Sequence, residues 1–242
     1  MKQLAALMAL LAAGCAGEPF SRPPLPDLKN PNPKTVREGF ASRLPEATRA
    51  THKSTLHFPF MDMTVLDHVD AEQAKDAFSV QGYMGLGMML YDIKGTRNSV
   101  TINSTVPQFE DYKFVLESIG HDLRHVYLDL TPGPNAKSVV WPKEIFFSQK
   151  TPEGTLCFEY AYDPPVLIEK RLSGLFGTVW KIRYYDYRTG ADGKIRPYGV
   201  VVDNSRYMYR IILHGQDVNE GRTIRPEEML TERELVDLKE TP

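Results

Sequence analysis

Residues 180–213 read WKIRYYDYRTGADGKIRPYGVVVDNSRYMYRIIL, and this stretch decides the fold class. Apolar or aromatic residues occupy every second position at 180–184, at 200–202 and at 207–213. Turn signals at 190–193 (Gly-Ala-Asp-Gly) and 203–204 (Asp-Asn) separate these runs. A period of two places alternate side chains on opposite faces of a strand, and such turns join antiparallel neighbours. The stretch therefore predicts consecutive antiparallel strands.

The same pattern continues toward the N-terminus. Alternating runs are found at 56–60, 78–82, 86–90, 100–104, 156–162 and 166–168. Turn residues such as Lys94-Gly95 and Asp163-Pro164-Pro165 lie between them. About eleven candidate strands result.

One long helix interrupts the strands, at about 110–130. Its apolar residues recur at helical spacing and form one face: Val115, Ile119, Leu123, Val126 and Leu130. The expected fold class is mainly β (α+β), a curved antiparallel sheet or incomplete β-barrel with this helix inserted midway. Such a helix either fills the concavity of the sheet or forms a lid over it. Shorter helices are expected at 35–43 and after Pro226.

The N-terminus carries an export signal. Lys2 precedes an apolar run, 4–13, which is too short to span a bilayer. The small residues Ala12-Ala13-Gly14 before Cys15 resemble the lipobox of bacterial lipoproteins, although leucine stands one place early, at 11. We therefore expect Cys15 to carry lipid. An ordinary secretory signal is the alternative. By the same resemblance, Ala16 favours the periplasmic face of the outer membrane.

The chain divides into four expected segments. A signal peptide, 1–14, precedes the lipidated cysteine and a proline-rich tether, 15–34, which at about 3 Å per residue reaches up to about 60 Å. The folded domain is expected at 35–217, and a tail with a short helix at 218–242. These boundaries predict one globular body held at a membrane surface.

Composition excludes some classes of function. The 242 residues carry a formal net charge of −2 with no basic block, so the footprint of a nucleic-acid binder is absent. There are two cysteines, and if Cys15 carries lipid, Cys157 has no partner for a disulfide. The hydrophobic content of 42% suffices for one sizeable core.

The order of these elements resembles the LolA/LolB superfamily of periplasmic lipoprotein carriers and receptors. The resemblance covers about 50–217 and rests on four segments. They are the strands with 85–92 (GLGMMLYD), the helix ending at 122–124 (DLR), and the blocks 180–187 (WKIRYYDY) and 196–202 (RPYGVVV). It implies an incomplete barrel with a helical lid and a cavity for acyl chains. The lipid anchor points to the LolB-like branch or a relative.

Alternation predicts which side chains face inward. They are Phe58, Val80, Met88, Leu90, Ile102, Phe158, Trp180, Ile182, Val200, Tyr209 and Ile211. The resemblance makes them the walls of a lipid-binding cavity, whereas the pattern alone fits a filled core equally well.

Two loops are weighed as membrane contacts. The resemblance implies a protruding apolar loop residue, and Leu86 between Gly85 and Gly87 is the candidate for it. The alternative is that Leu86 is a core residue of one continuous strand. The turn at 172–177 (LSGLFG) carries two large apolar residues, and the favoured interpretation is a hairpin tucked into the core.

Catalytic and metal chemistry finds little support. His121 and His125 have the i, i+4 spacing of a zinc-protease helix. However, aspartate replaces the glutamate base, no third ligand is evident, and both histidines are expected to face solvent. Cys157 lacks a surrounding motif and is expected to alternate with Glu159 on the strand face opposite Leu156. We expect no catalytic residue, no metal and no cofactor.

The sequence thus predicts a non-enzymatic lipid or lipoprotein carrier or receptor, anchored to the outer membrane. Its expected partners are the membrane, the acyl chains of a lipid or lipoprotein, and a periplasmic carrier protein. The alternatives are an interaction lipoprotein with a filled core and, less favoured, a metal-dependent hydrolase.

Overall fold

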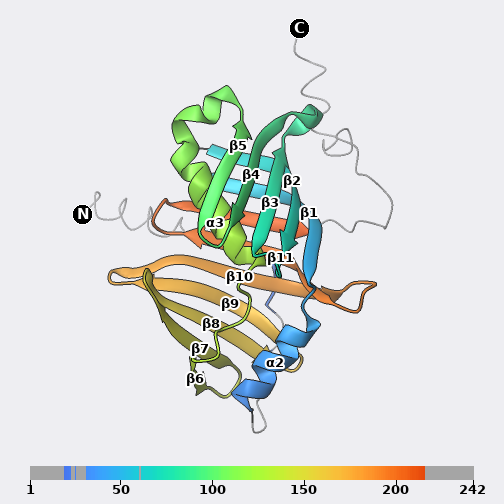
Figure 1. Cartoon of the computed structure of the whole chain (residues 1–242), viewed down its shortest axis with the longest axis vertical. Coiled ribbons are helices and arrows are strands. Elements are labelled where there is room, and N and C mark those ends of the chain that lie inside the picture. The colour runs from blue at the N-terminus through green and yellow to red at the C-terminus, as the bar shows by residue number, and fades with distance from the viewer. Residues whose placement is uncertain (1–18, 23–24, 26–30, 60, 216–242) are drawn as a thin grey trace, which may run out of the picture.

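The computed structural model describes residues 19–22, 25, 31–59 and 61–215. The described residues form one antiparallel sheet of twelve strands in the order β5-β4-β3-β2-β1-β12-β11-β10-β9-β8-β7-β6. Within β1–β5 and within β6–β12, consecutive strands pair with each other, and the pairing of β1 with β12 joins these two halves of the sheet. The predicted open, curved antiparallel sheet is confirmed, with one strand more than expected (Figure 1).

The strands are β1 Ala47–Phe58, β2 Met61–Glu72, β3 Ala77–Tyr83, β4 Met89–Thr96, β5 Ser99–Thr105, β6 Lys137–Val140, β7 Ile145–Thr151, β8 Gly154–Tyr162, β9 Pro165–Gly174, β10 Gly177–Thr189, β11 Ile195–Asn204 and β12 Tyr209–Gly215. The helices are α2 Pro33–Arg43 and α3 Lys113–Tyr127, with 3-10 turns η1 Gly85–Gly87 and η2 Pro107–Tyr112.

Helix α2 begins two residues before the predicted start. The Asn32 side chain caps it by accepting from the backbone N–H of Lys34 at 2.9 Å, and proline is favoured at the first helical position. The helix buries Val36 and Phe40 and packs against β9. Figure 1 shows it at the lower right of the molecule.

Helix α3 lies against β4 and β5 on the inner face of the sheet (Figure 1). Its apolar stripe, which includes Ile119 and Leu123, is buried as the periodicity predicts. Gly120 faces β4 and β5 so closely that a Cβ there would lie 2.6 Å from Val100 Cγ1 and 2.9 Å from Ile93 Cγ2. The missing side chain therefore sets the distance between helix and sheet.

We expect Gly120→Ala to destabilise the protein by up to about 2 kcal/mol. Alanine normally stabilises a helix interior by about 1 kcal/mol relative to glycine, but here overpacking costs about 1–3 kcal/mol. Urea denaturation measures the change in the free energy of unfolding. His121→Ala is the control, because His121 is the next residue of the helix and is exposed. A stabilised Gly120→Ala protein would contradict the close packing.

The start of the described chain lies against the outer face of the sheet. The Phe20 ring stacks on Tyr185 at 5.2 Å and contacts His214 at 4.6 Å between centroids. Leu25 packs against the core. Within the expected 15–34 tether, Phe20 and Leu25 therefore contact the body, and Pro33 and Lys34 belong to helix α2. Cys15, the signal peptide and the 218–242 tail lie outside the described residues.

Candidate functional site

The predicted cavity wall is mostly packed core. Eight of the eleven residues are buried in the main hydrophobic cluster, and Phe58 and Ile102 are partly buried against it. Met88 is a correction: it is 51% exposed, because the turn η1 breaks the strand and shifts the alternation before β4 resumes at Met89. Trp180 is different again, since it also lines an open cleft.

That cleft runs along α3, between the helix and the sheet. Two adjoining hollows of about 450 and 870 Å³ share His121, His125, Glu153, Leu172 and Trp180. We call them together the helix cleft. Phe114 and Tyr207 line the smaller hollow at the start of α3, and we call this end the mouth of the cleft. Both volumes lie in the range of ordinary small-molecule sites.

The lining of the helix cleft is amphipathic. Leu172, Val179 and Trp180 supply apolar surface, and Glu117, His121 and Arg206 supply polar surface. The imidazole of His125 stacks on the Trp180 indole at 4.7 Å between centroids. Such a site accommodates an apolar chain together with a polar group.

Side chains from the sheet fix the end of α3. Lys170 is fully buried on β9, and its Nζ donates to the carbonyl oxygens of His125 and Leu128 at 3.1 and 3.2 Å. The Tyr184 hydroxyl on β10 donates to the same His125 carbonyl at 3.3 Å. These donors satisfy carbonyls that have no partner within the helix. Burial lowers the pKa of Lys170 to about 7.

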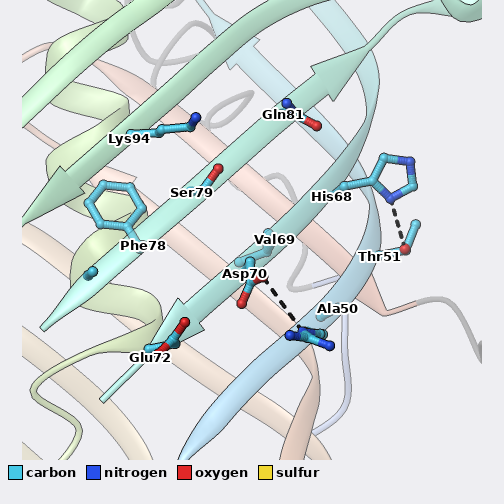
Figure 2. Close-up of a pocket in the computed structure, with 12 residues that line it drawn as sticks. Ala50, Thr51, His68, Val69, Asp70, Glu72, Phe78, Ser79, Gln81 and Lys94 are labelled. Carbon is cyan, nitrogen blue, oxygen red and sulfur yellow. Dashed lines mark hydrogen bonds and ion pairs between the residues drawn. The ribbon is translucent and has the colours of Figure 1, made fainter. Parts of the chain in front are cut away.

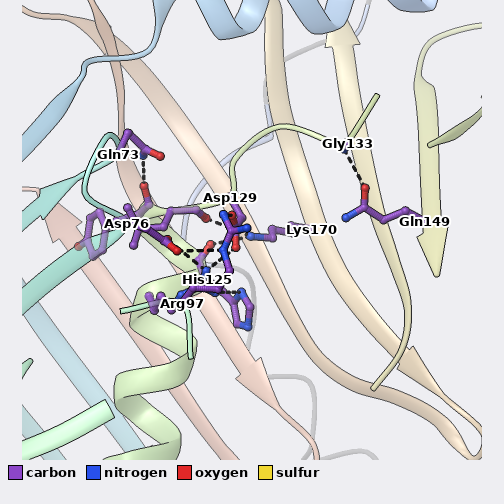
Figure 3. A network of polar contacts seen from close by, with 11 residues as sticks. Gln73, Asp76, Arg97, His125, Asp129, Gly133, Gln149 and Lys170 are labelled. Carbon is purple, nitrogen blue, oxygen red and sulfur yellow. Dashed lines mark hydrogen bonds and ion pairs between the residues drawn. The ribbon is translucent and has the colours of Figure 1, made fainter. Parts of the chain in front are cut away.

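An ion cluster closes the same end of the helix (Figure 3). Arg124 Nη2 lies 2.6 Å from Asp129 Oδ2 and 3.4 Å from Asp76 Oδ1. Arg97 contacts the same two carboxylates, at 3.0 and 2.9 Å. The cluster therefore ties the β2–β3 and β4–β5 turns to α3.

Nearer the start of α3, a buried polar group joins the helix to β11 and β12. The carboxylate of Asp122 accepts from the Tyr209 hydroxyl at 2.5 Å and from Asn204 Nδ2 at 2.7 Å. Ser118 lies 3.0 Å from the Tyr209 hydroxyl oxygen. Burial raises the pKa of Asp122 to about 6, against the effect of these hydrogen bonds.

A second buried carboxylate lies within the β1–β5 half. Asp67 on β2 accepts from the Ser54 hydroxyl and, at 2.6 Å, from the Tyr91 hydroxyl. Burial raises the pKa of Asp67 to about 6. His52, paired with Asp67 across β1 and β2, has no hydrogen-bond partner for either ring nitrogen among the described residues. Burial lowers its pKa to about 4.

The candidate chemistry at His121 and His125 is partly corrected. His121 is exposed as expected, but His125 stacks on Trp180 instead of facing solvent. Burial is the main cause that lowers the pKa of His125 well below its usual value. Within the described ranges no group of three or more His, Cys, Asp or Glu side chains is placed to hold a metal ion. Cys157 is a free, half-buried thiol on β8.

The two weighed loops have different outcomes. Leu86 lies in η1, so the interpretation of one continuous strand is wrong, and its side chain lies outside the described part of the chain. The turn at 172–177 is not tucked into the core. Leu172 is buried, but Leu175 and Phe176 at the tip of the β9–β10 hairpin are 91% and 99% exposed.

A separate groove of about 710 Å³ lies on the outer face of β1–β3 (Figure 2). Its side chains are mostly polar and partly paired with one another. Arg49 Nε lies 3.6 Å from Asp70 Oδ2, and Thr51 Oγ1 lies 3.0 Å from His68 Nδ1. Ala50, Val69, Ala77 and Phe78 supply the apolar part of its lining.

Sequence reasoning missed the buried polar residues of the interior. Alternation contains a signal for Lys170, because it stands between Ile168 and Leu172 on the inward face of β9. Asp122 likewise lies next to Ile119 and Val126 at helical spacing. A charged residue at a position that alternation assigns to the core therefore marks the polar contacts of α3.

Comparisons with known proteins bear on the fold. No family model matches the sequence, and no curated protein matches it either. Among solved structures, the chain is similar to a LolA superfamily protein from Nitrosomonas europaea, with a TM-score of 0.50 and 8% identity over 76% of this chain and 91% of that one. The chain therefore has the LolA/LolB-like fold that the sequence predicts.

Two further structures are similar at lower scores. One is a putative outer membrane lipoprotein-sorting protein domain from Vibrio parahaemolyticus, with a TM-score of 0.44 and 11% identity over 78% of this chain and 93% of that one. The other is a DUF1329 family protein from Desulfovibrio piger, with a TM-score of 0.47 and 9% identity over 78% and 94%. Among the described residues, no helix is long and apolar enough to cross a membrane.

Proposed function

We propose that this chain is an outer-membrane-anchored lipoprotein that binds acyl chains in the helix cleft, as a non-enzymatic carrier or receptor for lipids or lipoproteins in the periplasm. The observation that carries the proposal is an amphipathic cleft between sheet and helix in a LolA-like fold. Such a cleft shields acyl chains from water while a polar group stays at the surface. The sequence around Cys15 supports the anchor.

The site of binding differs from the one predicted. The inner-face residues near the middle of the sheet, such as Val80 and Ile211, are packed, so the acyl chain would lie beside α3 against Leu172 and Trp180. A longer chain would require α3 to move away from the sheet. The two ends of α3 are held by different kinds of contact. Lys170 and the ion cluster hold its end, whereas Asp122 and Ser118 make the polar contacts nearer its start.

We expect Phe114→Asp to weaken binding of a fluorescent fatty acid about tenfold, because the carboxylate repels the ligand at the mouth of the cleft and removes apolar surface. Phe114 is 55% exposed, so the fold should survive the change. Val139→Asp is the matched control, since Val139 is also 55% exposed but lies on the edge strand β6, and it should bind normally.

Mass spectrometry of the purified protein tests the proposal without a mutation. Co-purified lipid, and an acylated peptide beginning at Cys15, are the expected results. A protein without lipid that also fails to bind fatty acid would contradict acyl-chain binding. The polar groove of Figure 2 would then favour the alternative function, an interaction lipoprotein.

A further inference from the structure

The exposed apolar side chains of the described residues gather at one end of the sheet. The registers place the β9–β10 turn, the β11–β12 turn and the β1–β2 turn at this end, because Trp180 pairs with Asn204, Asn204 with Tyr209, and His57 with Arg210. Helix α3 begins here too, since the Phe114 and Tyr207 rings lie 6.3 Å apart. We call this end the apolar rim. The large exposed apolar side chains on these turns and at the start of α3 are Met61, Phe114, Leu175, Phe176, Tyr207 and Met208, whereas those at 139–141 lie elsewhere.

The tip of the β9–β10 hairpin is the most exposed part of the rim. Gly174 pairs with Gly177, so Leu175 and Phe176 are the two central residues of a tight turn. Polar residues or glycine normally occupy such positions. Because these two side chains are almost fully exposed, they contribute little to the stability of the fold. Figure 1 shows this hairpin extending away from the body at the left.

We propose that the apolar rim inserts into a lipid bilayer, with Leu175 and Phe176 as the deepest residues. This inference rests on the proposed membrane association and names the surface that makes the contact. Phe114 and Tyr207 line the helix cleft at this same rim, so insertion brings this end of the cleft to the lipid surface.

The shape of the rim favours a bilayer over a protein partner. A stable protein interface buries about 800 Å² on each side in a continuous patch. The rim instead presents separate turn tips, which a fluid bilayer can surround one at a time. Tyr207 and Met208 form a second tip, and the Arg206 guanidinium beside them suits lipid phosphates.

The reach of the N-terminal chain is consistent with this orientation. Phe20 contacts His214 on β12, which lies five residues, or about 17 Å, from Tyr209 at the rim. From Phe20 to Cys15 the chain has five residues, which span at most about 17 Å. This maximum length equals the distance along β12 from His214 to Tyr209.

Fluorescence quenching tests the depth of the tip. The full chain with Phe176→Trp is reconstituted into vesicles of phosphatidylethanolamine and phosphatidylglycerol that contain brominated acyl chains. We expect the added indole to be quenched at least twofold relative to vesicles without bromine. Val139→Trp, at a site on β6 that is 55% exposed, should show no added quenching, and the native Trp141 should not be quenched either.

A second variant measures the contribution of the tip. In a vesicle-binding assay, replacing both Leu175 and Phe176 with serine should weaken the association about 100-fold, because each apolar side chain contributes about tenfold.

Two results would overturn the proposal. In the first, bromine does not quench the added indole of the Phe176→Trp protein, and its emission stays that of a solvated indole. The other is a blue-shifted emission of the same indole without quenching, because this indicates a protein surface or a second copy of the chain. Fatty-acid binding is measured on the same samples. Lost fatty-acid binding with intact quenching contradicts the cleft function only, and the reverse result contradicts the rim only.

Discussion

Between pH 7.5 and 9.5, the free energy of unfolding is expected to rise by about 2–3 kcal/mol, and Lys170→Met is expected to abolish most of this rise. Lys170 is fully buried, and its pKa falls from 10.5 to about 7 in the folded protein. Between these two values the unfolded chain binds a proton that the folded chain does not. Stability therefore increases with pH across this window, and the penalty for burying the charge is complete below pH 7.

Urea denaturation at three pH values measures this rise. The upper limit stays below pH 10 because burial raises the pKa of several tyrosines, including Tyr91 and Tyr184, and their ionisation in the unfolded chain would reverse the trend. Lys150→Met is the control, since Lys150 is exposed and bonds only Thr155 among its described neighbours. A Lys170→Met protein with the wild-type slope would show that another group titrates.

Lys170 has two roles: its amine titrates, and it donates a hydrogen bond to the end of α3. Methionine is one atom shorter than lysine and leaves the Leu128 carbonyl without its Nζ donor, while the Tyr184 hydroxyl still donates to the His125 carbonyl. The loss of this contact with α3 is therefore expected to make the end of the helix more mobile in Lys170→Met at every pH. Hydrogen exchange of the 123–128 amides detects this change independently of the titration.

The repetitive features of the fold can be predicted from the sequence. Period-two alternation and turn residues identify the strands, because a sheet with one buried face imposes that pattern on every strand. The limits appear where the strand is interrupted. Alternation assigns Met88 to the inner face, but η1 breaks the alternation and leaves its side chain exposed.

The candidate site is less predictable, because it depends on how far α3 lies from the sheet. Nothing in the spacing of Val80, Ile182 and Ile211 distinguishes a packed interior from a hollow one, and in the structure they are packed. The missing Cβ of Gly120 lets α3 approach β4 and β5 closely. Among the described residues next to α3, the space for a ligand therefore lies along the flank of the helix, beside Trp180.

The exposed β9–β10 tip shows a related limit. A Leu-Phe pair in a turn fits a buried corner and a protruding tip equally well, and alternation gives no distance from the core. The register of β9 and β10 decides the question, because Gly174 pairs with Gly177 and forces the two residues between them beyond the last pair of the sheet.

Asp67→Asn is expected to stabilise the protein by roughly 3 kcal/mol at pH 8, and this gain is expected to shrink below about 1 kcal/mol at pH 4. Burial raises the pKa of Asp67 from 3.8 to about 6, so above pH 6 the folded state holds a charge that the unfolded state solvates better. This penalty disappears as the pH falls from 6 to 4. His52 titrates in an overlapping range with the opposite sign, but it is present in both proteins and largely cancels from their difference.

Asp70→Asn is the matched control, because Asp70 lies on the same strand with its side chain exposed on the outer face, paired only loosely with Arg49 at 3.6 Å. Its effect should stay within about 0.5 kcal/mol at both pH values. An Asp67→Asn protein that is less stable at pH 8 would mean that Ser54 and Tyr91 require a carboxylate as their acceptor. A more stable variant would instead show that this carboxylate opposes folding. Fatty-acid and vesicle binding of that variant would then reveal whether the buried charge serves the cleft or the rim.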